Sequence, residues 1–318
     1  NQGDPEAWKA WWYEPSAKGY CFIGKDNIPF HTIIWQAELM GVERIYEDDP
    51  TKKLNLPYDV PANEFMNVEG AQLSKSRNWA IWLPDILERY DPDAIRYYVA
   101  SVLPESRDSD FSWPDFVSRN NDQLVATWGN LANRVISFAN KHWDGHVPEP
   151  GALRPEDQEL IDEIHGGFET VGAEIEAVRL RAALQECMRL ARQANGYLDR
   201  APWFSVIKED KQTAATTVYT ALQAVNNLKL LFSPFLPFST ERLHRMLGYD
   251  EPLFGDLTIE TVEESERSHK VLSYNAKHAS GRWEPVQLPA GQAFRDPAPL
   301  YQKLDEDLAE EERSRLGQ

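Results

Sequence analysis

Residues 112–143 have the sequence SWPDFVSRNNDQLVATWGNLANRVISFANKHW, and the character of the chain changes at this stretch. Ser112, with Pro114 in the first turn and Asp115 three residues later, is typical of the start of a helix. Apolar side chains then recur with helical spacing on one face; they are Leu124, Trp128, Leu131, Val135 and Phe138. The stretch therefore predicts a long amphipathic helix that ends near Trp143.

The sequence after this helix predicts further helices. A connection rich in Pro and Gly, HVPEPGALRP, comes first. Amphipathic patterns then cover residues 156–176, 178–198 and 211–231, and a short helix is predicted at 239–248. No strand pattern of any weight appears before about Leu257. Together these segments predict an α-helical bundle.

Upstream, residues 20–108 alternate between strand and helix patterns. A short apolar run ends in Gly24, and residues 28–41 then show helical spacing. A second strand is predicted at about 64–68, and two short helices, each opened by a proline, follow it. Strands that alternate with helices predict a parallel sheet. The predicted fold class is therefore α/β followed by all-α.

The composition fits a soluble chain of about two domains, with 318 residues of which 42% are hydrophobic and 26% charged. We expect most of it to fold, with the acidic C-terminal end as the exception. Cys21 and Cys187 lie far apart and form no CxxC pair, so neither a disulfide framework nor a cysteine zinc site is indicated, and the reducing cytoplasm fits best. No apolar run is long enough to span a membrane.

The net charge of −18 counts against non-specific binding to DNA or RNA, because Lys and Arg supply most of that affinity by neutralising phosphates. Specific binding through a local basic surface is compatible with it, since arginines cluster at residues 179–192 while acidic residues concentrate at 305–312. The chain starts at Asn1, near a predicted Trp-rich amphipathic helix. We therefore expect it to be part of a longer protein.

Two loops carry side chains suited to binding ATP. Ser74-Lys75-Ser76 places two hydroxyls around an ammonium group, which could wrap a polyphosphate, although the same triplet is an ordinary solvated loop in most proteins. Gly24 ends a predicted strand and permits close approach of a ligand to the backbone, and Asp26 could accept hydrogen bonds from a ribose. On local grounds alone, a helix cap formed by Asp26 or Asn27 is the favoured alternative.

Two further groups of residues are candidates for binding. His31 and Trp35 lie four residues apart on one predicted helix, where they could line a pocket or belong to the core. The long helix of residues 112–143 carries a polar face of Asn130, Asn133, Arg134 and Ser137. A solvated surface explains that face on periodicity alone. There is no GxxxxGK or GxGxxG motif, so the P-loop and dinucleotide-binding classes lose support.

Three long stretches together resemble a known family. They are FIGKDNIPFHTIIW, LPYDVPANEFMNVEGAQLSKSRNWAIWLPDILERYDPDAIRYY and DFSWPDFVSRNNDQLVATWGNLANRVISF. In order and spacing over roughly residues 1–240, the chain resembles the methionyl-tRNA synthetases of the archaeal and eukaryotic type. The resemblance implies the C-terminal half of a Rossmann-like class I catalytic domain, followed by a helical anticodon-binding bundle.

The resemblance also implies roles for individual residues. The sequence QLSKS at residues 72–76 aligns with the family's KMSKS signature, in which the second lysine contacts ATP phosphates. That lysine is Lys75, flanked by Ser74 and Ser76, while Gln72 and Leu73 depart from the signature. The remaining roles are ribose binding by Gly24 and Asp26, a backbone contact of Met66 with adenine, a methionine pocket formed in part by Ile28, His31 and Trp35, and anticodon recognition by Asn130, Arg134 and Trp203.

The implied activity is that of a methionine–tRNA ligase acting on methionine, ATP with Mg²⁺, and tRNA(Met). No HxGH motif occurs in the sequence, so we expect the isolated chain to be inactive and any zinc to belong to an N-terminal portion outside it. The alternatives are another class I synthetase or a non-catalytic tRNA-binding module. The expected domains are 1–108 for the catalytic part, 109–250 for the anticodon-binding bundle and 251–318 for a partly irregular extension.

Overall fold

A computed structural model of the chain describes residues 4–42, 45–263 and 267–318. It divides into two compact units, of which the first comprises Asn1–Ser74 and Val102–Phe111 and the second Lys75–Ser101 and Ser112–Gln318. No helix within the described ranges combines the length and the apolar character that a membrane crossing requires.

The first unit consists of short helices and short parallel strand pairs. Its elements are α1 (Lys9–Trp12), β1 (Ile23–Gly24), η1 (Lys25–Asn27), η2 (Phe30–Ile34), α2 (Trp35–Val42), β2 (Ala62–Asn63), β3 (Met66–Val68) and β4 (Ser109–Phe111). Strand β1 pairs with β2 and β3 pairs with β4, both in parallel, as the α/β pattern predicts. A small core of Tyr13, Leu39 and Leu54 packs against Trp8 and Trp35.

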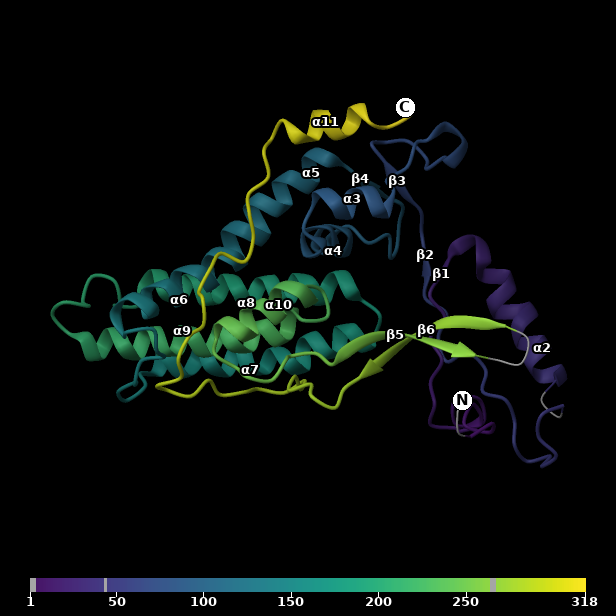
Figure 1. Cartoon of the computed structure of the whole chain (residues 1–318), viewed down its shortest axis with the longest axis horizontal. Coiled ribbons are helices and arrows are strands. Elements are labelled where there is room, and N and C mark those ends of the chain that lie inside the picture. The colour runs from purple at the N-terminus through teal and green to yellow at the C-terminus, as the bar shows by residue number, and fades with distance from the viewer. Residues whose placement is uncertain (1–3, 43–44, 264–266) are drawn as a thin grey trace. The chain divides into compact units, whose positions relative to one another are not determined.

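The second unit is a helical bundle with a hairpin and a C-terminal helix (Figure 1). Its elements are η3 (Lys75–Arg77), α3 (Leu83–Arg89), α4 (Pro92–Ser101), α5 (Trp113–Ser118), η4 (Arg119–Gly129), α6 (Asn130–His142), α7 (Pro155–Glu176), α8 (Leu180–Arg200), α9 (Lys211–Phe232), α10 (Pro237–Met246), β5 (Asp256–Glu263), β6 (Ser268–Asn275) and α11 (Leu308–Ser314). Helix α9 is its centre, because residues 214–232 are all buried.

The long helix predicted at residues 112–143 forms as α5, η4 and α6 in succession. Its predicted apolar face is buried along the whole length, and Trp128 stacks on Phe232 of α9 with ring centroids 4.8 Å apart. The middle section, η4, has the wider turns of a π-helix. Ser112 stands at the start of the helix but makes no side-chain capping hydrogen bond, whereas Pro114 and Asp115 both lie in the first turn as predicted.

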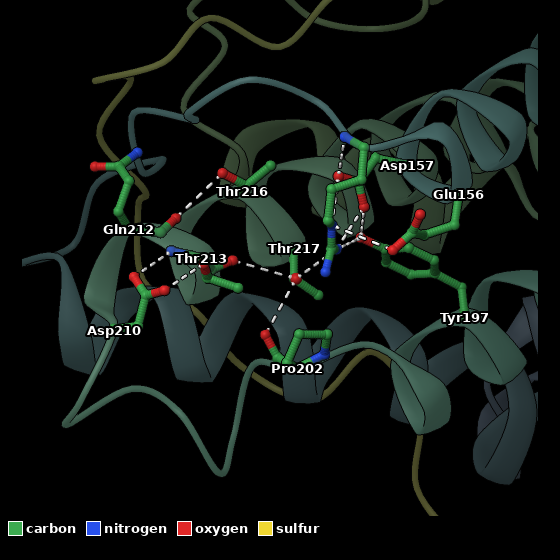
Figure 2. Close-up of polar contacts among 10 residues, drawn as sticks. Glu156, Asp157, Tyr197, Pro202, Asp210, Gln212, Thr213, Thr216 and Thr217 are labelled. Atoms are coloured by element: carbon green, nitrogen blue, oxygen red, sulfur yellow. Dashed lines mark hydrogen bonds and ion pairs between the residues drawn. The ribbon is translucent and has the colours of Figure 1, made fainter.

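A buried polar network fixes the start of α7 against α8 and α9 (Figure 2). The Asp157 carboxylate accepts hydrogen bonds from Arg154 and from the Tyr197 hydroxyl, each at 2.6 Å. Arg154 also donates to Thr217 Oγ1 at 2.9 Å, and Thr217 in turn donates to the carbonyl oxygen of Pro202 at 3.2 Å. The network therefore ties three helices to the loop that begins at residue 201.

The expectation that the C-terminal end does not fold is wrong for residues 308–314. They form α11, which contacts α5 (Figure 1). Glu312 of α11 is 3% exposed and is held by Arg89 and by the Tyr90 hydroxyl, each within 2.9 Å. The acidic run gave no sign of this partner, because Arg89 lies more than two hundred residues earlier in the chain.

Candidate functional site

In the first unit, the loop after β1 is shaped by Gly24. A Cβ atom at this position would lie 2.7 Å from Asp26 Oδ1, so a larger residue here would displace the Asp26 side chain from where it lies over the loop. Asp26 itself is exposed, as a ribose-binding residue would have to be. The N-cap positions of η1 and η2 are Gly24 and Pro29, so neither Asp26 nor Asn27 caps these turns as the helix-cap alternative expected.

Lys25, which the motif analysis passed over, anchors this loop. Its ammonium group donates to Glu64 and, at 2.9 Å, to Asp108 Oδ1, and it lies 4.4 Å from the centre of the Phe65 ring. The hydrogen bond to Glu64, followed by that to Asp108, raises the pKa of Lys25. Lys25 is therefore engaged within the protein, whereas the neighbouring Asp26 faces solvent.

His31 and Trp35 lie against each other at the junction of η2 and α2. Their rings meet edge to face with centroids 5.5 Å apart, and the Nδ1–H of His31 donates to the carbonyl oxygen of Asn27 at 3.2 Å. Trp35 also lines a mainly apolar pocket of about 390 Å³ together with Trp12. Ile28 and His31 do not line it, so the structure brings only part of the predicted methionine pocket together.

Two predicted ATP-binding segments lie further along the chain. Met66 begins β3, is half-buried and pairs with Ser109 of β4. Lys75 begins the turn η3 and is exposed, and its ammonium group has no hydrogen-bond or ion-pair partner among the described residues. Its ammonium group is thus available to a phosphate. The boundary between the two compact units falls between Ser74 and Lys75, and Ser76 is exposed.

In the second unit, the structure brings Arg134 and Trp203 together. The guanidinium carbon of Arg134 lies 5.8 Å from the centre of the Trp203 ring, within cation–π range. Arg134 donates to Asn195 Oδ1 at 3.3 Å and to Asp199 Oδ1 at 3.4 Å, both on α8. Asn130 lies one turn earlier on α6 and is exposed. The polar face of α6 is therefore not simply solvated.

Trp203 is half-buried in the loop between α8 and α9. Its ring nitrogen donates to the carbonyl oxygen of Leu198 at 2.9 Å, and its ring meets Phe138 of α6 edge to face at 4.6 Å. The polar network of Figure 2 holds the preceding residue, Pro202, through Thr217. The next residue, Phe204, is 73% exposed. The loop therefore presents two aromatic rings from a fixed base.

Sequence reasoning missed three residues of this second site: Asn195, Asp199 and Phe204. Asn195 donates to the carbonyl oxygen of Thr127 at 3.0 Å and so joins α8 to the helix that carries Arg134. The spacing of Asn195, Asp199 and Trp203 by four residues is a signal that could have found the first two. Phe204 carried no such signal.

No group of three or more His, Cys, Asp or Glu side chains that could hold a metal ion occurs in the parts of the chain that the structure describes. Both cysteines are free thiols, and burial raises the pKa of Cys187.

Two protein families match the chain. Residues 1–136 match the family described as tRNA synthetases class I (M), and residues 147–276 match the anticodon binding domain of methionyl tRNA ligase. Among curated proteins, the methionine–tRNA ligase of Thermomicrobium roseum is 54% identical over 318 residues, which is 99% of this chain and 53% of that protein. The corresponding ligase of Chloroflexus aurantiacus is 48% identical over 325 residues, covering 99% and 54%.

The fold is similar to that of solved structures. Methionyl-tRNA synthetase of Mycobacterium tuberculosis bound by methionyl-adenylate matches with a TM-score of 0.72 and 24% identity, over 91% of this chain and 50% of that one. At this identity the likeness shows the fold alone, and it agrees with the predicted class I catalytic part followed by a helical bundle. The chain spans about half the length of the curated relatives it matches. The archaeal and eukaryotic type stays a prediction.

Proposed function

The chain belongs to the methionyl-tRNA synthetase family, and from this premise we propose that it provides one half of a methionine–tRNA ligase. The complete enzyme activates methionine with ATP to form methionyl-adenylate and then transfers the methionyl group to tRNA(Met). It acts in the cytoplasm, ATP arrives as its Mg²⁺ complex, and zinc belongs to a portion outside these residues. The domain boundaries at 108 and 250 are part of the same proposal.

In the activation step, the exposed Lys75 stabilises the charge that develops on the departing pyrophosphate, with Ser74 and Ser76 as flanking donors. Asp26 accepts from the ribose hydroxyls, and Gly24 allows the nucleotide to approach the backbone. The Met66 backbone contacts adenine. Trp35, with His31 and Ile28, forms one side of the methionine pocket.

One observation carries the tRNA-binding part of the proposal: Arg134 and Trp203 lie 5.8 Å apart on a helix and a loop that are fixed to each other. Arginine can donate two hydrogen bonds to a base edge, and tryptophan can stack on an unpaired base, which is how single-stranded RNA loops are usually recognised. Asn130, one turn from Arg134, adds an amide to the same face. Together these residues would recognise the CAU anticodon.

The test is a titration of the 318-residue chain with a CAU hairpin and with a hairpin of scrambled loop sequence, at fixed salt. Trp203→Ala should weaken CAU binding roughly ten- to a hundredfold, because stacking on one base is worth about 1–3 kcal/mol. Arg134→Ala should cost a similar factor and reduce discrimination between the two loops.

The matched control is Trp11→Ala, which removes a 76% exposed tryptophan from the first unit and should leave both affinities unchanged. A parent chain that binds both hairpins equally would contradict the anticodon assignment. Melting temperatures of all variants show whether Trp203→Ala acts on binding or unfolds the bundle.

A further inference from the structure

A small pocket of about 250 Å³ opens between α4, η4 and α8, inside the second unit. Its polar lining consists of Ser101, Arg119, Gln123, Gln185 and Arg192, and the described residues that line it include no acidic side chain. Its two arginines and the lack of acidic side chains among its described lining residues set this pocket apart in a chain whose net charge is −18. By contrast, a second pocket between α7 and α8 is lined by Glu156, Glu159 and Glu163 of α7, with Arg200 of α8 as the one basic residue among its described lining residues.

Of the two arginines, Arg119 is paired with one carboxylate, whereas Arg192 has no ion-pair partner among the described residues. Arg119 donates from Nε to Asp115 at 2.8 Å, and its two terminal nitrogens have no partner among the described residues. Arg192 is exposed, and its guanidinium group has no hydrogen-bond or ion-pair partner in the described ranges. Arg189, one turn away on the same helix, is different, because it is held by both Glu163 and Glu186.

The positive charges of Arg119 and Arg192 both influence Tyr97, the buried residue at the bottom of the pocket. Tyr97 is 1% exposed there, and its hydroxyl donates to Gln123 Oε1 at 2.8 Å. Burial raises the pKa of Tyr97, and the charges of Arg119 and Arg192 oppose that rise. An anion that entered the pocket would therefore meet two guanidinium groups together with side-chain amide and hydroxyl donors.

The pocket and the Arg134–Trp203 site lie along one seam between neighbouring helices. On α8, Arg192, Asn195 and Asp199 follow at three- and four-residue steps and so share a face. Asn195 bridges the seam, since it donates to the Thr127 carbonyl and accepts from Arg134. Arg192 precedes Asp199 by seven residues, which is about 10 Å along the helix axis.

We propose that the Arg119–Arg192 pocket binds backbone phosphates of the tRNA stem whose anticodon occupies the Arg134–Trp203 site. The inference rests on the proposed function and deepens it. One guanidinium group can donate two parallel hydrogen bonds to the oxygens of a phosphate. Such contacts position an RNA without reading its sequence.

The dimensions of the pocket favour a phosphate over a complete small-molecule ligand. Its volume of about 250 Å³ lies below the roughly 300–1,000 Å³ that small-molecule sites usually have. Its only aromatic lining residue, Tyr97, is buried, so it offers no exposed ring on which a base could stack. A protruding phosphate group of a larger molecule fits both facts.

The experiment titrates the full chain with a CAU hairpin that includes its stem and with the CAU loop alone as a single strand, over a series of salt concentrations. Arg192→Gln should weaken hairpin binding roughly three- to tenfold for CAU and scrambled loops alike. It should reduce the slope of log K against log salt by about one and leave binding of the loop alone unchanged. Arg192→Lys should keep the slope and lose part of the affinity, since it retains the charge without the fork of donors.

Arg189→Gln is the control, because it removes a neutralised arginine from the same helix and should change neither affinity nor slope. If Arg192→Gln behaves like Arg189→Gln while Trp203→Ala still weakens CAU binding, the pocket inference is wrong and the anticodon site stands. An equal loss for the loop alone would overturn the assignment to the stem. A parent chain that binds CAU and scrambled hairpins equally contradicts the proposed function. In that case the change in the salt slope caused by Arg192→Gln still tests whether the pocket binds phosphate.

Discussion

Lys229 of α9 is a lysine buried in the bundle core, with 1% of its surface exposed. Its ammonium group donates to Asn226 Oδ1 at 2.8 Å and to His244 Nδ1 at 2.9 Å, and it lies 4.4 Å from the centre of the Tyr249 ring. Burial lowers the pKa of Lys229 to about 7. Burial and the charge of Lys229 lower the pKa of His244 to about 3.

The lowered pKa of Lys229 predicts that the stability of the folded state rises with pH. In the unfolded chain a lysine has a pKa of about 10.4, so between about pH 7 and pH 10 the unfolded state binds a proton that the folded state does not. The free energy of unfolding should therefore increase over that interval. In Lys229→Met this contribution should vanish. Thermal melts of both proteins across the interval test this, and an equal rise in the variant would contradict it.

At the scale of single residues, the sequence indicated polar side chains of the candidate sites but not the residues that contact them. The polar face with Asn130 and Arg134 follows from helical periodicity, because that pattern is local. The contacts of Arg134 with Asn195 and Asp199 depend on how two distant helices pack, which local pattern does not encode. The ion pairs of Lys25 with Glu64 and Asp108 were missed for the same reason.

At the scale of elements, α11 depends on one buried carboxylate. Glu312 accepts two hydrogen bonds from Arg89 and one from the Tyr90 hydroxyl, and Tyr90 belongs to the segment just after α3. Glu312→Ala leaves these donors without a partner. We expect a cost of about 1–3 kcal/mol, below the ~3–5 kcal/mol of a fully buried pair, because Arg89 keeps some contact with solvent.

The change should be local and should appear as faster amide hydrogen exchange in α11. Glu310→Ala is the matched control, since Glu310 is exposed on the same helix and should exchange as in the parent. Equal protection of α11 in Glu312→Ala and Glu310→Ala would show that the apolar contacts of the helix suffice to hold it.

Most helix bounds were predictable to within a few residues, because apolar periodicity and prolines mark them. The predicted helix at 156–176 forms as Pro155–Glu176, and that at 211–231 as Lys211–Phe232. The wide turns of η2 and η4 were not predicted, since they have no distinct residue signature. The strand predicted at 20–24 forms a regular ladder at Ile23–Gly24 and an isolated bridge at Tyr20, because strand length depends on a partner elsewhere in the chain.

At the scale of the whole molecule, net charge did not predict the basic surface that we propose to bind tRNA. The excess of acidic residues is real, yet Arg119, Arg134 and Arg192 gather along one seam of the bundle. The fold class was predictable because long amphipathic patterns dominate the second unit. The placement of the charged side chains was not, since it depends on which helix faces meet.

The last prediction concerns catalysis by the chain. The sequence contains no HxGH motif, and we expect the donors to one side of the ATP phosphates to come from outside this chain, because preorganised donors are needed around the whole transition state. The purified chain should therefore not catalyse methionine-dependent exchange between ATP and pyrophosphate. Several large apolar side chains of the first unit are exposed, among them Trp11, Ile33 and Met40, as expected of a surface that packs against a further portion.

Adding the half of the Thermomicrobium roseum ligase that this chain does not span should restore exchange, because the two sequences are 54% identical where they overlap. In the mixture, Lys75→Ala should lower the exchange rate by a factor on the order of 10², as expected when one charged donor to the transition state is removed. Lys53→Ala, at an exposed lysine of the first unit, should leave the rate unchanged. Exchange by the chain alone would show that it holds a complete site, and an unchanged rate for Lys75→Ala would make the loop at residues 74–76 an ordinary surface segment.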